Sequence, residues 1–283
     1  MKKILISLMF GCSVIGTAYA VESGNVVVAK AVDSSKPVVP VVGTVVGYAL
    51  TTEAGLDRVW QNREKLTNKE QTNIANYYLT ASNEPSDYAI AWKTARLIYF
   101  LGNYGVGEER FTVKNKDEGV KLFNYGVKVG KLAMSLDPSK VEGYYWYAVD
   151  LGSYGLAKGI LAAASSAGDG MDALKAAKKI DPSYQWYGSS RILGRYYQEL
   201  PGVFGGSNKK ALALYEEATQ KSANSSVNWL YLGRYYLKDG YATKGLEMCI
   251  KGASLPNVDG KLEESRYKRE LNECVSDAKA KLS

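Results

Sequence analysis

The sequence of 283 residues has room for one large helical domain or one array of short repeats. It contains no histidine, which removes the commonest general base and metal ligand, and its three cysteines have no zinc-binding spacing. The formal net charge of +7 comes from basic residues spread along the chain, which favours a solvated surface over nucleic-acid binding. Without histidine a Ser/His/Asp or Cys/His catalytic set is excluded, and no other catalytic motif stands out. We therefore expect a protein that is not an enzyme and holds no metal or cofactor.

Residues 1–20 have the features of an export signal. A short basic start precedes an apolar run at residues 4–15, and residues 18–20, Ala-Tyr-Ala, form a small-x-small cleavage site. The run is too short to span a bilayer comfortably, and no later segment is long enough. We expect cleavage after Ala20 and a periplasmic protein without a transmembrane segment. Lipid attachment at Cys12, in a weaker lipoprotein-like sequence, is the alternative.

Residues 21–50 form a predicted arm outside the helical domain. Its valine-rich runs are β-prone, but Pro37, Pro40 and several glycines interrupt every one of them. We expect this flexible arm to lie across the helical domain as an extended strand or to stay mobile. The remaining residues, 51–283, carry almost no strand signal and form the predicted helical domain.

Caps, prolines and apolar periodicity divide the helical domain into ten or eleven expected helices. Residues 67–70 and 139–142 each fit a capping box, and residues 155–167 are nearly all small or apolar. The expected helices cover residues 53–65, 67 to about 81, 87–102, 116–136, 141–154, 170–180, 186–199, 207–221, 225–239, 241–254 and 261–281.

The segment at residues 229–236, W-L-Y-L-G-R-Y-Y, fits the opening helix of a tetratricopeptide (TPR) hairpin, W-x2-L-G-x2-Y, at every position. Its large side chains share one helix face, and Gly233 allows a second helix to approach closely. Degraded copies of this spacing begin near Trp92, Tyr144 and Ser190. Because one hairpin cannot bury its apolar face alone, the sequence predicts an all-α, irregular TPR-like array of antiparallel helix hairpins.

Two cysteines, Cys249 and Cys274, remain after the predicted signal cleavage. An oxidising compartment allows them to pair. We predict a disulfide that joins the last hairpin to the C-terminal helix. The alternative is that Cys249 is simply a core residue of that hairpin.

Four short blocks follow one another in the middle of the chain. They are G-Y-Y-W-Y-A-V-D-L-G-S-Y-G-L-A-K-G at 143–159, I-D-P-S-Y at 180–184, R-I-L-G-R at 191–195 and L-P-G-V-F-G-G-S at 200–207. As an ordered set they resemble the T-component family of TRAP transporters. The resemblance implies a periplasmic, TPR-like helper protein that binds the extracytoplasmic solute receptor of an organic-acid transporter. It also implies a homotrimer with a hydrophobic pore or cavity in each protomer.

Five residues in or near these blocks are candidates for a ligand site. They are Tyr144, Tyr147, Lys158, Arg191 and Arg195. Small side chains at 155–167 leave space between helices, so we expect a cavity between the second and third hairpins. There Lys158 and Arg191 would meet the carboxylate of a bound organic acid, since an isolated buried cation is costly. The alternatives are that Lys158 extends into solvent and that Arg191 and Arg195 pair with Asp150 or Glu199.

Two functions remain open at this point. The first is an adaptor of solute uptake that binds a receptor protein and a small apolar acid. The second is a general TPR scaffold of the cell envelope without a small-molecule site. A closed cavity lined by Tyr144, Tyr147 and residues 155–167 would favour the first function, and an open concave groove would favour the second.

Overall fold

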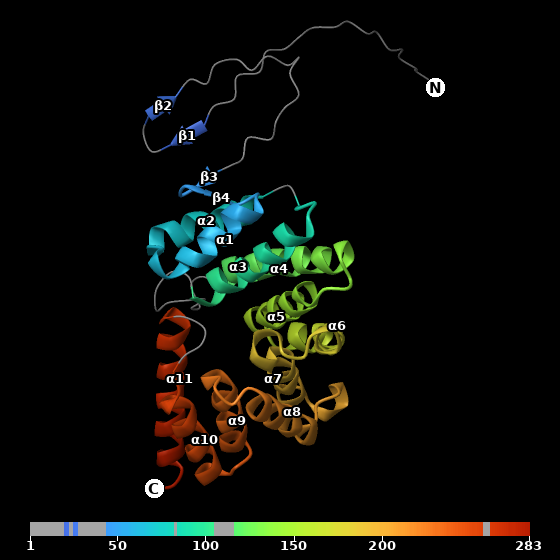
Figure 1. Cartoon of the computed structure of the whole chain (residues 1–283), viewed down its shortest axis with the longest axis vertical. Coiled ribbons are helices and arrows are strands. Elements are labelled where there is room, and N and C mark those ends of the chain that lie inside the picture. Colours follow the sequence, from blue (N-terminus) through green and yellow to red (C-terminus); the bar gives the residue numbers. More distant parts are fainter. Residues whose placement is uncertain (1–19, 23–24, 28–43, 82–83, 105–115, 257–260) are drawn as a thin grey trace, which may run out of the picture. The chain divides into compact units, whose positions relative to one another are not determined.

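The computed structural model describes residues 20–22, 25–27, 44–81, 84–104, 116–256 and 261–283 (Figure 1). The chain divides into two units, residues 1–41 and 42–283, and each is described by itself. Apart from Ala20, the predicted signal peptide and the alternative lipid site at Cys12 lie outside the described residues. In the first unit, β1 (Ala20–Glu22) and β2 (Asn25–Val27) form an antiparallel pair.

The second unit includes the end of the segment predicted to be a flexible arm. Here β3 (Thr44–Val45) and β4 (Tyr48–Ala49) form a small antiparallel hairpin. Leu50, which follows it, is only 2% exposed and belongs to the first apolar core. The backbone of Ala49 lies so close to the first helix that a Cβ on Gly55 would clash with it. Residues 44–50 are therefore a packed part of the helical unit.

Eleven α-helices follow among the described residues, together with two 3₁₀ turns, and the all-α prediction is confirmed. The bounds are α1 (Glu53–Asn62), α2 (Asn68–Thr80), α3 (Tyr88–Tyr104), α4 (Lys116–Leu136), α5 (Val141–Lys158), α6 (Ile160–Ile180), α7 (Tyr184–Glu199), α8 (Asn208–Lys221), α9 (Ser226–Lys238), α10 (Ala242–Ser254) and α11 (Lys261–Ala280), with η1 (Arg63–Lys65) after α1 and η2 (Gly202–Phe204) after α7.

One of the two predicted capping boxes forms and the other does not. At the start of α2, the Thr67 hydroxyl accepts from the Glu70 amide, and the Glu70 carboxylate accepts from the Thr67 amide. The box predicted at residues 139–142 is wrong, because the Ser139 hydroxyl donates to the Asp137 carboxylate at 2.6 Å. Helix α5 begins at Val141 without a side-chain cap.

The predicted start of a helix at Gly170 is also wrong. Helix α5 continues to Lys158, the chain turns at Gly159 with φ of +119°, and α6 begins at Ile160. Alanines in the 155–167 stretch are strong helix formers, and the positive φ is one that glycine adopts readily. A Cβ on Gly155 would lie 2.8 Å from the Cα of Ala163. Small residues in the 155–167 stretch therefore allow α5 and α6 to pack closely against each other.

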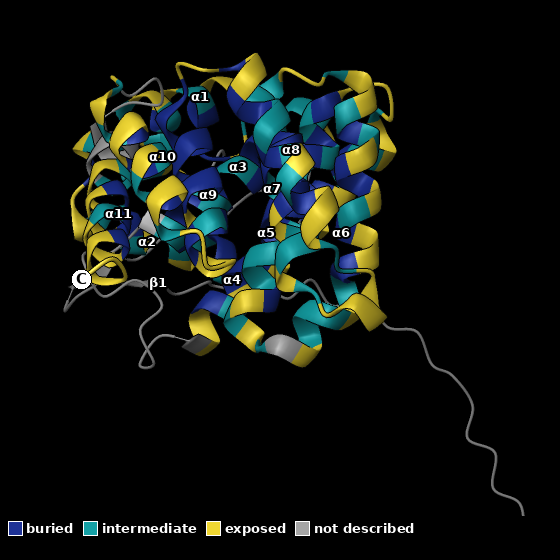
Figure 2. Ribbon diagram, turned by 90° about the horizontal axis from the view of Figure 1, so that it is seen from below, coloured by how far each residue is buried: buried dark blue, intermediate teal, exposed yellow. Residues whose placement is uncertain are grey.

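The helices pack in successive hairpins, α3 with α4, α5 with α6, α7 with α8 and α9 with α10. The opening helices α3, α5, α7 and α9 each contact the next one in the series and surround the centre of the bundle in Figure 2, while α6 lies at its edge. As predicted, Gly233 permits a close approach, since a Cβ there would lie 2.3 Å from the Cys249 Sγ. A disulfide joins Cys249 of α10 to Cys274 of α11, with their Cα atoms 6.0 Å apart. Each hairpin is thus buried by its neighbours, as repeats require.

Candidate ligand site

Two adjoining pockets lie between the opening helices and α11. We call the first the apolar pocket; water-sized molecules can enter a volume of about 140 Å³ in it. We call the second the arginine pocket, and its corresponding volume is about 180 Å³. Both are lined by Tyr99 of α3, Val149 of α5, Ile192 of α7 and Tyr231 of α9. The two pockets therefore share part of their lining, and together we call them the inner hollow.

The apolar pocket has a wall of leucine and alanine side chains. Leu151 and Leu156 come from α5, Ala163 and Ala167 from α6, and Leu200 follows α7. The two alanines lie in the small-residue stretch, so its short side chains leave space here as the sequence suggested. This wall has no hydrogen-bonding side chain and is suited to a hydrocarbon surface.

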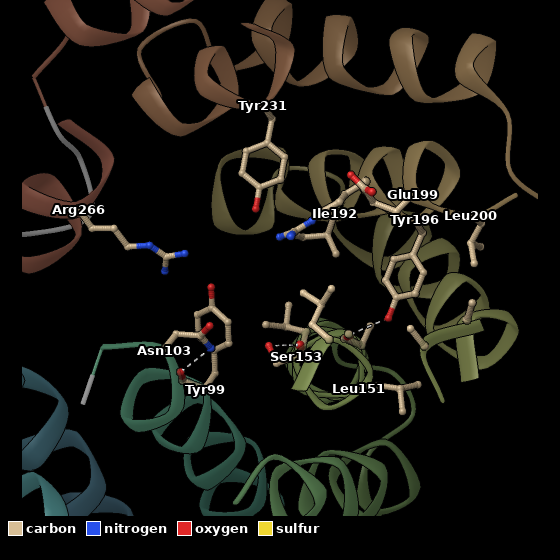
Figure 3. A pocket seen from close by; sticks show the side chains of 17 residues that line it. Tyr99, Asn103, Leu151, Ser153, Ile192, Tyr196, Glu199, Leu200, Tyr231 and Arg266 are labelled. Carbon is tan, nitrogen blue, oxygen red and sulfur yellow. Dashed lines mark hydrogen bonds between the residues drawn. The ribbon is translucent and has the colours of Figure 1, made fainter. Parts of the chain in front are cut away.

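Several polar groups of the apolar pocket lie away from this wall. In Figure 3 the hydroxyls of Tyr99 and Tyr231 and the guanidinium of Arg266 point toward the same central space. Arg195 lines this end and is exposed, so the hollow is open to solvent beside it. Glu199 also lines the pocket, and its carboxylate accepts from the Lys238 ammonium at 2.8 Å.

The electrostatic field at this end favours negative charge. Burial alone would raise the pKa of the Tyr231 phenol, but Arg195, Arg191 and Arg266 outweigh burial and hold that pKa below its ordinary value. In turn, the Tyr231 phenol is the largest cause that raises the pKa of Arg195. A carboxylate placed here would meet the same attraction.

The arginine pocket is lined by cations and aromatic rings. Arg63 and Arg96 lie over Trp60, with the guanidinium carbons 4.2 Å and 4.1 Å from the ring centroid. Burial lowers the pKa of Arg96 to about 10. Arg191 lines the same pocket from α7. Among the described residues that line this pocket, none is an aspartate or a glutamate.

A left-handed turn at the start of α7 supplies another part of the arginine pocket. Gln185, Trp186 and Tyr187 have φ of 52°, 53° and 61°, a conformation in which each such residue stores about 1–3 kcal/mol. The Asn228 amide donates to the Trp186 carbonyl at 3.0 Å, and Arg191 donates to the Asn228 side-chain oxygen at 2.6 Å. These bonds hold the turn, which presents Gln185 and Trp186 to the pocket.

Of the five predicted site residues, Arg195 and Arg191 line the hollow, each in a different pocket. Arg191 is buried and donates a hydrogen bond to the neutral side chain of Asn228. This bond is found in place of the ion pair with Asp150 or Glu199 that was the alternative.

The other three predicted residues do not line either pocket. Tyr144 lies away from both pockets and donates to the Pro138 carbonyl at 3.3 Å. Tyr147 is buried in the core, where the Gly130 backbone approaches it closely. Lys158 is exposed at the end of α5 and donates to the Tyr154 hydroxyl at 2.6 Å. A lysine at a helix end reaches solvent easily, so the solvent alternative describes it.

Sequence reasoning missed most of the polar residues of the hollow. They are Trp60, Arg63, Arg96, Tyr99, Tyr231 and Arg266. They come from α1, η1, α3, α9 and α11, which the array brings together. The one available signal was the abundance of tyrosine, which accounts for 22 of the 283 residues.

In the described part of the chain, no group of His, Cys, Asp or Glu could hold a metal ion. Within the same residues, none of the helices combines the length and the apolar character needed to cross a membrane.

Comparison with known proteins identifies the family. The sequence model of the family described as regulator of microtubule dynamics protein 1-3 matches residues 57–203, which run from α1 to η2. The chain belongs to this family. The match includes the α3, α5 and α7 sides of the inner hollow, whereas α9 and α11 lie beyond it. No curated protein matches the chain.

Among solved structures, TTC0263, a thermophilic TPR protein of Thermus thermophilus, matches with a TM-score of 0.53 and 18% identity. The match covers 78% of this chain and all of that one, which agrees with a TPR-like fold. MamA matches with a TM-score of 0.41 and 18% identity, over 74% of this chain and 95% of that one.

Proposed function

We propose that the chain is a non-catalytic binding adaptor that takes a small, mainly apolar acid into its inner hollow and docks to a partner protein. One observation carries the proposal. The apolar pocket joins a hydrocarbon wall, which includes Leu156 and Ala167, to a cationic end at Arg195. A molecule with a carboxylate at one end and a hydrocarbon tail matches both parts.

The contacts expected for such an acid follow from the lining. The carboxylate accepts from Arg195 and Arg266, in the field that already lowers the pKa of Tyr231. The tail lies against the leucine and alanine wall, where it loses contact with water. A charge-assisted hydrogen bond contributes about 1.5–3 kcal/mol. Because Arg195 is exposed, we use the lower end of that range.

We further propose that the partner is the extracytoplasmic solute receptor of a TRAP-type transporter, that the adaptor is a homotrimer, and that it works in the periplasm. This part rests on the four sequence blocks at 143–207 and on the export-like start of the chain. The family description names regulators of microtubule dynamics, and that activity belongs to the proteins so described. From the family match we use only the shared helical region, residues 57–203, and we do not transfer that activity to this chain.

A general protein-binding scaffold is the second candidate. It is favoured by the opening of the hollow, because Leu156 lines the apolar pocket while 62% exposed. Such an opening admits a peptide side chain as readily as a small acid. TPR-like arrays commonly present extended concave surfaces to partner proteins.

Calorimetric titration with octanoate tests the first candidate. We expect saturable binding of octanoate and none of octanol, since the alcohol cannot use the cationic end. Arg195→Gln should weaken octanoate binding about tenfold, which corresponds to about 1.4 kcal/mol. Lys158→Gln is the matched control, because it removes the same charge outside the hollow and should leave binding unchanged.

The Leu156→Ser variant tests whether the leucine and alanine wall binds the hydrocarbon tail. It should weaken octanoate binding, and because Leu156 is exposed, the substitution should leave the fold intact. If octanoate does not bind, or binds equally to Arg195→Gln, the small-acid proposal fails and the scaffold remains. Capture of a solute receptor from a periplasmic extract then tests the partner separately.

A further inference from the structure

We infer that Tyr196 limits the length of the hydrocarbon tail that the apolar pocket accepts, which makes the site selective against long-chain acids. This inference rests on the proposed function, and it adds the class of acid and the residue that determines it. Tyr196 comes from α7 and lines the apolar pocket, but it belongs neither to the leucine and alanine wall nor to the cationic residues.

The leucine and alanine wall ends on α6 where Tyr196 begins. Ala163, Ala167 and Gly170 follow one another at intervals of four and three residues, so they lie on one face of α6. The two alanines line the apolar pocket, whereas Gly170, the next position on that face, does not. A Cβ on Gly170 would lie 2.4 Å from the Tyr196 hydroxyl oxygen. The tip of the Tyr196 side chain therefore covers the position at which the wall would otherwise continue.

The Tyr196 ring lies in a slot between α5 and α6. A Cβ on Gly152 of α5 would lie 3.8 Å from the Tyr196 Cε2, and a Cβ on Gly170 of α6 would lie 3.1 Å from the Tyr196 Cε1. The two edges of the ring thus face two glycines on different helices. At the tip, the Tyr196 hydroxyl donates to the Ala148 carbonyl of α5 at 3.2 Å, and burial raises the pKa of this phenol. These contacts fix the ring as an end wall of the pocket.

This end wall lies on the side of the pocket away from Arg266. In Figure 3 the Tyr196 ring and the Arg266 guanidinium stand on opposite sides of the space, and a dashed line joins the Tyr196 hydroxyl to α5. An acid whose carboxylate binds at the cationic end therefore extends its tail toward Tyr196. A tail that is too long must leave the pocket beside Leu156, which is 62% exposed, and its last carbons stay in contact with water.

The affinity should therefore rise with tail length only until the tail reaches Tyr196. Each methylene group that becomes buried should raise the affinity about fourfold, and one that stays in water should add almost nothing. A smaller side chain at position 196 would open the slot, because Gly152 and Gly170 have no side chains to fill it. The tail could then continue between α5 and α6.

Calorimetric titration with hexanoate, octanoate, decanoate and dodecanoate, each below its micelle concentration, provides the test. In the unmodified protein we expect the affinity to rise along the series and then to level off at a limiting length. In Tyr196→Ala the affinity should level off at least one member later. The first acid beyond the limiting length should bind to this variant on the order of tenfold more tightly than to the unmodified protein, because two further methylene groups are buried.

Tyr196→Phe is the matched control, because it keeps the ring and removes only the hydrogen bond to the Ala148 carbonyl. It should have the same limiting length as the unmodified protein. Tyr196→Leu is a second test variant, which fills more of the slot than alanine does and should also increase the limiting length. Far-UV circular dichroism shows which variants are folded.

The inference is overturned if the affinity of the unmodified protein still rises from decanoate to dodecanoate. It is also overturned if the folded alanine or leucine variant levels off at the same acid as the unmodified protein. In both cases the proposed function stands, since the acids bind. If none of the acids binds to the unmodified protein, the proposed function fails and this inference fails with it.

Discussion

Asn228→Ala should be one of the most destabilising single substitutions in the second unit. The Asn228 side chain is almost completely buried and links three segments. Its amide donates to the carbonyls of Trp186 and Ala218, both at 3.0 Å, and its oxygen accepts from Arg191 at 2.6 Å. Alanine removes all these bonds and leaves a guanidinium in the interior without its neutral partner.

The magnitude follows from the number and kind of bonds lost. Two neutral bonds at about 1 kcal/mol each and one charged bond at about 1.5–3 kcal/mol give a loss of roughly 3.5–5 kcal/mol. For a domain of this size that is a fall in Tm on the order of 10 °C. The left-handed turn at 185–187 should relax at the same time, because its backbone loses a partner that holds it.

Urea unfolding followed by far-UV circular dichroism measures the loss of stability, and tryptophan fluorescence before the transition reports on Trp186. Asn208→Ala is the control, because Asn208 is exposed and, among the described residues, its side-chain amide bonds only to the Asp239 side chain at 3.2 Å. It should change stability by less than about 0.5 kcal/mol. If Asn228→Ala loses no more than about 1 kcal/mol, the turn does not depend on these bonds and the reasoning is refuted.

Three further predictions concern separate parts of the unit. Reduction of the Cys249–Cys274 disulfide, which closes 25 residues, should lower stability by about 3.5 kcal/mol; two free thiols titrated in non-reduced, denatured protein would contradict the bond itself. Gly233→Ala should destabilise α9 and α10 by about 1–3 kcal/mol, because the new methyl would lie 2.3 Å from a sulfur, while Gly168→Ala, which meets nothing within 4 Å, should stabilise α6 by up to about 1 kcal/mol. If both glycine variants change Tm by the same amount in the same direction, the close packing of α9 against α10 at Gly233 is contradicted. Burial raises the pKa of Asp150 well above its usual range, and neither carboxylate oxygen has a hydrogen-bond partner among the described residues. The folded state therefore binds this proton more tightly than the unfolded state does, and its stability falls as pH rises above about 3.9. Asp150→Asn should be more stable than the unmodified protein at pH 7, with an advantage that shrinks toward pH 4 in urea titrations; an advantage that does not change with pH would exclude the carboxyl as its source.

The helices could be predicted from the sequence because their signals are local. A capping residue, a proline or an apolar repeat acts within a few residues, and α4 was placed at residues 116–136 on that basis. Errors arose where two local signals competed. Ser139 could cap a helix or bond to Asp137, and the structure has the second arrangement. In the same way, Gly159 ends one helix and allows the next to begin without a loop, a reversal that apolar periodicity does not reveal.

The candidate site was much harder to predict. Arg195 was identified because it lies in a distinctive block of sequence, but Lys158, chosen from its apolar surroundings, is exposed on the surface. Tyr99, Tyr231 and Arg266 lie on α3, α9 and α11, and no local pattern says that these helices face one space. The turn at 185–187 could not be foreseen either, since the bond that holds it comes from Asn228, two helices later.

The sequence by itself determined the all-α class, the hairpin repeat and the small residue Gly233 at which two helices meet, because periodicity and side-chain size act between neighbouring segments. The tertiary structure decided which polar side chains converge. The placement of each hairpin in an irregular array depends on every interface before it, and here Tyr99 of α3 and Arg266 of α11 line the same pocket. The inner hollow, its Arg195 end and its arginine pocket are products of that accumulated geometry.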